Sequence, residues 1–348
     1  MPTALPESDA EVTRRIGVTD LHSDLPLALL HRRFAGVEGS LRDEWLPHLR
    51  AGGIDTIVCA VYIDDLFLPE GALRRAVQLV DALREEVALC ADGFALATTA
   101  EQIEATHVDG KIALVLAFEG AEPFGNDLAG LRLFHALGMR MLSFAWMRRT
   151  AYADGAWEND SGGGLTRLGK QAVAEMNRLG IIPDVSHLSD RSTWDVLEAS
   201  SGPVIASHSN VRALRDHPRN LTDDMIRAIA TSGGLVGAVA VANYIADQEA
   251  TVTGWADHID YLVNLAGIEH VGLGFDFYEE IETMGASHGI SAWGPNTGLG
   301  QLAVPGMSAW PDVVNLTGEL RRRGYSEDAL AKIYGGNFRR VLGAVSTR

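Results

Sequence analysis

The stretch Ile16–Asp24, IGVTDLHSD, decides the fold class. It is a short apolar run that ends in the polar triplet His22-Ser23-Asp24, and no glycine-rich phosphate fingerprint follows it. An open doubly wound sheet usually carries that fingerprint after its first strand. The stretch therefore favours a closed (β/α)8 barrel over an open doubly wound sheet.

The rest of the chain alternates short apolar runs with amphipathic helical patterns. Eight runs predict strands, at Ile16–His22, Thr56–Tyr62, Lys111–Phe118, Met139–Ala145, Ile181–Ser186, Val204–Ser207, Leu235–Val241 and His270–Gly274. Five intervening stretches predict helices, at Gly71–Ala91, Thr166–Leu179, Arg191–Ala199, Asp223–Ser232 and Ala256–Leu265. Apolar strands between amphipathic helices predict a parallel sheet with covered faces, and eight such units predict a barrel. We expect an α/β fold, a single TIM-type (β/α)8 domain over residues 1–348, with two or three helices over Pro311–Arg348.

Composition excludes several classes of protein. The chain has 348 residues, 29 basic against 46 acidic, and a formal net charge of −17. Such a chain is not attracted to nucleic acid or to anionic membranes. Met1–Arg15 is polar, no run approaches the ~20 apolar residues of a membrane span, and the two cysteines match no zinc or redox spacing. We expect no nucleic-acid or membrane partner and a cytoplasmic location.

Histidine and acidic side chains fall at the carboxyl ends of five predicted strands. They are His22, Asp24, Glu119, His187, His208 and Asp276. In a barrel these strand ends converge on the catalytic face. Imidazole and carboxylate without thiolate suit zinc or a similar first-row ion. The set is too large for one catalytic zinc and suits two metals that share a carboxylate, hold a hydroxide between them and polarise a carbonyl.

Each of these residues also has a plainer interpretation. An isolated histidine at a strand end is more often structural than a ligand. Asp276 is either a sixth ligand or a general base. Arg219 is either a solvated loop arginine or a bidentate clamp on a substrate carboxylate. The metal interpretation is favoured because chance would have to place such side chains at the ends of five separate strands. The other eight histidines, at positions 31, 48, 107, 135, 217, 258, 270 and 288, are interpreted mostly as surface residues.

At this point the chain resembles the renal (membrane) dipeptidase family of the amidohydrolase superfamily, from Asp20 to Leu342. The matching motifs include Asp20–Pro26, Ala117–Gly120, Asp184–His187, Ser207–Ser209, Arg219-Asn220, Gly274–Phe277 and Gly335–Phe338. The resemblance implies a (β/α)8 barrel with two zinc ions and dipeptide substrates; it also implies a homodimer. By matching motif, His22 and Asp24 would hold one zinc, His187 and His208 the other, and Glu119 both. Asp276 would be the proton shuttle, and Arg219 would bind the substrate carboxylate.

The chain departs from the family pattern at the pocket. Relatives of the mammalian enzyme have a histidine after the fourth strand that contacts the scissile carbonyl oxygen, and this chain has Trp146 there. The family segment Gly-Asp-Phe-Asp-Gly is Phe275–Glu279 here. We expect the aromatic residues Tyr62, Trp146 and Tyr278 to contact substrate. Arg148 and Arg149 could supply the charge that the missing histidine would carry.

The sequence therefore predicts a binuclear zinc dipeptidase that acts through a metal-bridging hydroxide, with Asp276 as proton shuttle. Two alternatives stay open. A metal-dependent amidohydrolase could act on N-acyl amino acids or another small amide, and a barrel of the same fold could bind a ligand without turnover.

Overall fold

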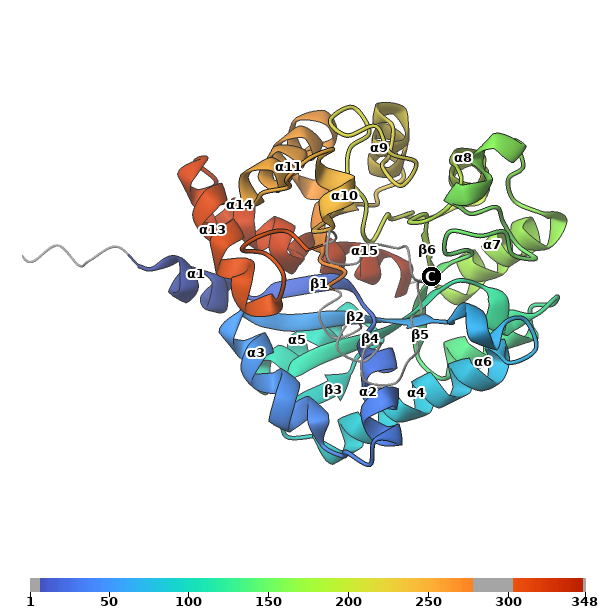
Figure 1. Cartoon of the computed structure of the whole chain (residues 1–348), viewed down its shortest axis with the longest axis horizontal. Coiled ribbons are helices and arrows are strands. Elements are labelled where there is room, and N and C mark those ends of the chain that lie inside the picture. Colours follow the sequence, from blue (N-terminus) through green and yellow to red (C-terminus); the bar gives the residue numbers. More distant parts are fainter. Residues whose placement is uncertain (1–6, 278–302, 347–348) are drawn as a thin grey trace, which may run out of the picture.

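Parallel strands form the centre of the protein, and helices surround them (Figure 1). The structure is a computed structural model and describes residues 7–277 and 303–346. The strands are β1 Val18–Ser23, β2 Ile54–Tyr62, β3 Phe94–Leu96, β4 Ile112–Glu119, β5 Met139–Ser143, β6 Ile182–Asp184, β7 Val236–Val239 and β8 Val271–Gly274. One sheet has the order β1-β2-β4-β5-β6, with β3 also on β4, and β7 pairs with β8. Every ladder is parallel, as predicted.

The two sheets close into a barrel through shorter contacts. Ile205 forms a single parallel bridge to Asp184 at the end of β6, and the next residue, Ala206, forms one to Val236 at the start of β7. The segment around these two residues therefore links β6 to β7. The backbone N–H of Asp276, just beyond β8, donates to the carbonyl of His22 in β1 at 3.2 Å. The predicted barrel is confirmed, although the predicted strand Val204–Ser207 contributes isolated bridges and no regular ladder.

Strand β3 was not predicted. Its three residues pair with the first residues of β4, on the edge of β4 that β5 occupies from Leu116 onward. A three-residue strand shows no measurable alternation of apolar and polar side chains, so periodicity could not reveal it.

The helices cover the outside of the barrel. Their bounds are α1 Asp9–Ile16, α2 Leu25–Phe34, α3 Leu46–Ala51, α4 Ala72–Leu89, α5 Ala100–Val108, α6 Ala129–Ala136, α7 Arg167–Leu179, α8 Asp190–Ala199, α9 Asp223–Thr231, α10 Ala242–Ile245, α11 Val252–Ala266, α13 Val313–Arg322, α14 Glu327–Ala331 and α15 Asn337–Ser346. Several begin where a hydroxyl accepts a free backbone N–H; Thr166 caps α7 and Thr222 caps α9. The helices expected near the C-terminus are α13, α14 and α15. No helix in the described ranges is both long and apolar enough to span a bilayer.

Side chains fill the inside of the barrel. Along β2, Val58 belongs to the inner cluster, whereas its neighbours Ile57 and Cys59 pack against the surrounding helices. This alternation is the period of two that a strand imposes. Phe338 and Val341 of α15 join the inner cluster, together with residues at the starts of several strands. The helix α15 thus closes the end where the strands begin, and the end where the strands finish is the one at which His22 and Glu119 stand.

Candidate metal centre

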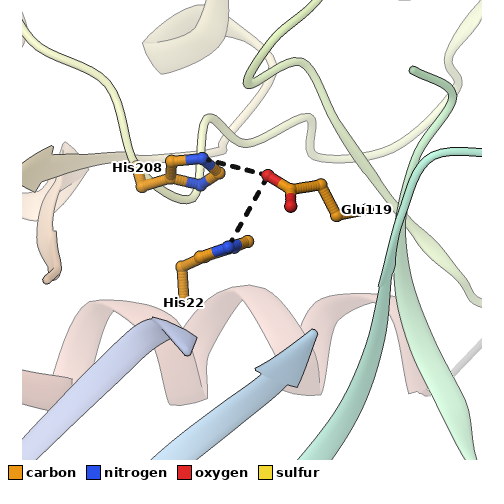
Figure 2. Close-up of side chains that lie close together, drawn as sticks. All are labelled: His22, Glu119 and His208. Carbon is orange, nitrogen blue, oxygen red and sulfur yellow. Dashed lines mark ion pairs between the residues drawn. The ribbon is translucent and has the colours of Figure 1, made fainter. Parts of the chain in front are cut away.

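Four of the predicted ligands meet at one point within the barrel mouth. His22 belongs to β1 and Glu119 ends β4, while His187 and His208 follow β6 and the bridging segment. Glu119 Oε1 lies 3.6 Å from His22 Nε2, 2.8 Å from His187 Nε2 and 3.4 Å from His208 Nε2. Figure 2 shows His22 and His208 both facing this carboxylate. All four side chains are buried.

A second group of possible ligands also includes His22. His22, Asp24 and Asp276 each offer a ligand atom, and these atoms lie within 4.8 Å of one another. Asp276 Oδ1 is 3.8 Å from His22 Nε2. His22 therefore belongs to both groups, and the six residues predicted from strand ends converge on one site.

Two buried carboxylates orient the histidines. Asp184 accepts the hydroxyl of Ser207, whose oxygen lies 2.8 Å from His208 Nδ1, so that Nε2 of His208 faces Glu119. Asp20 accepts the backbone N–H of His22 at 3.1 Å and the indole N–H of Trp310 at 2.9 Å. Such outer partners fix the direction of metal-ligating groups. Sequence reasoning missed both roles, although each aspartate stands inside a quoted motif.

The electrostatics of the site disfavour charge unless a cation is present. Burial raises the pKa of Glu119 well above its ordinary value, and the nearby carboxylates of Asp24 and Asp276 raise it further. Burial raises the pKa of Asp24 in the same way. Burial, helped by the Arg219 charge, lowers the pKa of His22 to about 3. Neutral imidazoles beside crowded carboxylates are groups that a divalent cation stabilises.

The residues present fit a metal. Within the described ranges, His22 Nε2 and Asp24 Oδ1 are buried atoms without a hydrogen-bond partner. Nε2 of His187 and Nε2 of His208 lie 2.7 Å apart and both approach Glu119. Nitrogen and carboxylate oxygen donors without thiolate suit zinc.

Arg219 is buried beside the cluster and is not a solvated loop residue. It donates from Nη2 to the carbonyl of His208 at 2.9 Å and from Nη1 to the hydroxyl of Ser209 at 3.4 Å. Its guanidinium lies 5.3 Å from the ring centroid of Tyr244, a neighbour that the sequence did not indicate. In the described part of the chain its Nε has no hydrogen-bond partner.

The aromatic residues expected at the pocket lie beside His187. The ring centroid of Trp146 is 6.0 Å from that of His187 and 5.4 Å from that of Tyr62. Tyr278, the third expected contact, lies outside the described residues.

The charges of Arg148 and Arg149 are balanced by loop carboxylates. Arg148 donates to Glu122 at 2.9 Å and pairs with Asp65, and Arg149 pairs with Asp154. Both arginines are therefore already paired, and neither offers an uncompensated positive charge in place of the missing histidine.

Two other histidines differ from the surface interpretation. His258 is buried, and its Nδ1 accepts the backbone N–H of Val211 at 3.1 Å. Nδ1 of His217 accepts the backbone N–H of Arg219 at 3.1 Å, so this ring supports the arginine loop. His288 lies outside the described residues.

Comparisons with known proteins agree with this geometry. The family model "Membrane dipeptidase (Peptidase family M19)" matches residues 7–348. The chain is 31% identical to the dipeptidase aclJ of Aspergillus oryzae over 355 residues, covering 96% of this chain and 79% of that protein. A metallopeptidase of Rhodobacter sphaeroides, solved with a phosphinate mimic of the dipeptide L-Ala-D-Ala, is similar with a TM-score of 0.83 and 27% identity, over 94% of this chain and 99% of that one. An amidohydrolase of Pseudomonas aeruginosa is similar with a TM-score of 0.81 and 25% identity, over 98% of this chain and 100% of that one. The chain belongs to the membrane dipeptidase family, peptidase family M19, and is a metal-dependent hydrolase.

Proposed function

We propose that the protein is a binuclear zinc dipeptidase. The observation that carries this proposal is the convergence of three histidines and three carboxylates at the mouth of the barrel. The similarity to a peptidase solved with a dipeptide mimic supports the choice of substrate.

Five of the six residues would divide between two metal positions. His22 and Asp24 would hold one zinc, His187 and His208 the other, and Glu119 both. When bound, a pair of zinc ions lowers the pKa of water and polarises a carbonyl oxygen.

The chain's own residues supply the remaining chemistry. Asp276 is buried next to His22, and its carboxylate can take a proton from the attacking water and pass it to the leaving nitrogen. Arg219 can hold a substrate carboxylate through a charge-assisted pair, with Nε available in its buried position. The barrel wall excludes bulk water from both groups and so strengthens their electrostatic effects.

A substrate screen tests the proposal. Zinc-loaded protein is assayed against L,L-, L,D- and D,L-dipeptides and against N-acyl amino acids, with His187→Ala as the matched inactive variant. We expect at least one dipeptide class to be hydrolysed by the wild type, and most of that activity to be lost in His187→Ala.

The same screen separates the alternatives. N-acyl amino acids also carry the carboxylate that Arg219 would bind, so a preference for them would identify a different amidohydrolase. No hydrolysis of any substrate by a protein shown to hold two zinc ions would favour a ligand-binding barrel.

A further inference from the structure

Three aromatic rings form a continuous surface that leads out of the metal centre. We call Tyr62, Trp146 and Trp157 the aromatic wall. Ring centroids of Tyr62 and Trp146 are 5.4 Å apart, and those of Trp146 and Trp157 are 5.1 Å apart, both edge to face. Trp146 is 7% exposed, whereas Trp157 is 62% exposed. The wall therefore runs from the buried neighbourhood of His187 to solvent.

The outer end of the wall is fixed relative to the site. The backbone N–H of Trp157 donates to the carbonyl of Met147 at 2.9 Å, and that of Ala156 donates to the carbonyl of His187 at 2.8 Å. Gly155 allows this approach, because a Cβ there would lie 2.5 Å from the carbonyl of Met147. The segment that carries Trp157 is thus hydrogen-bonded to the backbone of His187.

The inner end of the wall is fixed by Arg148. Its guanidinium lies 5.4 Å from the ring centroid of Trp146 and 5.9 Å from that of Tyr62. Hydrogen bonds to Glu122 and to the carbonyl of Ile63 hold the arginine in place. A rigid aromatic surface gives a ligand contact area at a low cost in conformational entropy.

The wall and Arg219 contact different histidines of the metal centre. Trp146 lies beside His187, whereas Arg219 is bonded to the backbone of His208. A dipeptide whose C-terminal carboxylate reaches Arg219 and whose scissile carbonyl lies at the metal centre has its N-terminal residue left to face His187. That residue's side chain then meets the wall.

We propose that the aromatic wall binds the side chain of the substrate's N-terminal residue, and that Trp157 gives the enzyme a preference for large aromatic or apolar side chains there. This inference rests on the proposed function. An exposed tryptophan next to a site has an unused apolar face, and an aromatic contact contributes beyond the area it buries.

The test compares Phe-Ala with Ala-Ala in the wild type and in Trp157→Ala. We expect the wild type to prefer Phe-Ala, and the ratio of the two kcat/KM values to fall roughly three- to tenfold in the variant, as expected for a lost aromatic pair. Phe34→Ala is the matched control, because Phe34 is also a large exposed aromatic residue, 60% exposed, and it stands at the end of α2, which carries none of the three rings of the wall. The ratio for Ala-Phe over Ala-Ala should change little in Trp157→Ala.

A second measurement does not depend on turnover. Phosphinate mimics of Phe-Ala and Ala-Ala are titrated calorimetrically into the zinc-loaded proteins, and the ratio of their Kd values should shift by the same factor. An unchanged ratio in Trp157→Ala, or a shift confined to the C-terminal residue, would overturn the inference. The wild type could bind the Phe-Ala mimic more tightly, and Trp157→Ala could lose this preference, while neither protein hydrolyses a dipeptide. That outcome would support the role of the wall and contradict only the proposed reaction.

Discussion

His187 and Asp276 are the non-glycine residues in the described ranges whose φ lies in the left-handed region, at 71° and 55°. Both belong to the metal centre. A left-handed backbone at such a residue costs of order 1–3 kcal/mol and persists only where the surrounding structure enforces it. Its presence at these two positions indicates that the surrounding contacts hold His187 and Asp276 in place.

Asp276→Asn should keep the fold and the metals but lose catalysis. The amide retains the size and the hydrogen-bonding shape of the carboxylate, yet it cannot accept and return a proton. We expect kcat to fall by roughly two to four orders of magnitude, the usual contribution of a general acid or base. Steady-state kinetics and elemental analysis of the same preparation check this. A variant with near wild-type kcat would show that the proton travels elsewhere.

Arg219→Met should weaken substrates that have a free C-terminal carboxylate far more than amidated ones. Methionine keeps much of the stem and removes the charge-assisted pair, which only a carboxylate can use. KM is compared for a dipeptide and its amide, with Arg191→Met on the exposed face of α8 as control. Equal losses for both substrates would mean that the arginine has a structural role only.

The clustering of the candidate ligands could be predicted from sequence because strand ends in a barrel share one face, so chain position is enough to place His22, Glu119 and His208 together. The roles of Asp20 and Asp184 could not. Both accept backbone N–H groups, and one donor to Asp20 is Phe275, which follows β8 and is brought next to β1 only when the barrel closes. An aspartate that orients a ligand and one that binds the metal look the same in a sequence.

At the scale of elements, Glu319 connects two C-terminal helices through a network of ion pairs. It accepts hydrogen bonds from Arg322 and from Arg323 of the same turn, and Arg323 also pairs with Asp257 and Asp260 of α11. These bonds lower the pKa of Glu319 from 4.5 to about 2. The network joins α13 to α11 on the outside of the barrel.

Because the folded pKa is the lower one, the stabilisation by Glu319 is fully present above pH 4.5 and is lost as the pH falls toward 2. Glu319→Gln should therefore lower the free energy of unfolding at pH 7 by up to about 1 kcal/mol, and the difference from wild type should vanish in acid. Urea unfolding at several pH values checks this, with the exposed Glu198→Gln as control. A difference that stays constant from pH 7 to pH 3 would contradict the assignment.

Long elements were easier to predict than short ones. The pattern over Thr166–Leu179 gave α7 to within one residue, because a helix of that length repeats its apolar face several times. The segment Val204–Ser207 was recognisable as apolar, but its pairing with two neighbours through single bridges depends on how the barrel closes. Strand β3 is fixed by its contact with β4 and carries no signal of its own.

At the scale of the whole molecule, the metals should contribute to stability. Without a cation the buried carboxylates of Asp24, Glu119 and Asp276 face one another at close range. Complete removal of metal should lower Tm by several degrees, and zinc should restore it, since a ligand that binds only the folded state stabilises that state.

Thermal scans paired with elemental analysis check this, and the reconstituted protein should hold about two zinc ions per chain. His187→Ala should bind less zinc and show a smaller change on chelation. An unchanged Tm after verified removal, or a single ion after reconstitution, would contradict the binuclear proposal.

The hydrogen bond from Asp276 to the carbonyl of His22 joins residues that lie far apart in the chain. A chain leaving the ribosome has made His22 and Asp24 long before it makes β8, so the early part of the protein carries half of a metal site with no partner. Contacts between such distant residues slow folding, and incompletely folded intermediates of larger chains expose apolar surface. The five proposed ligands are therefore all synthesised before β8, but the barrel that holds them in place closes only when this last strand docks.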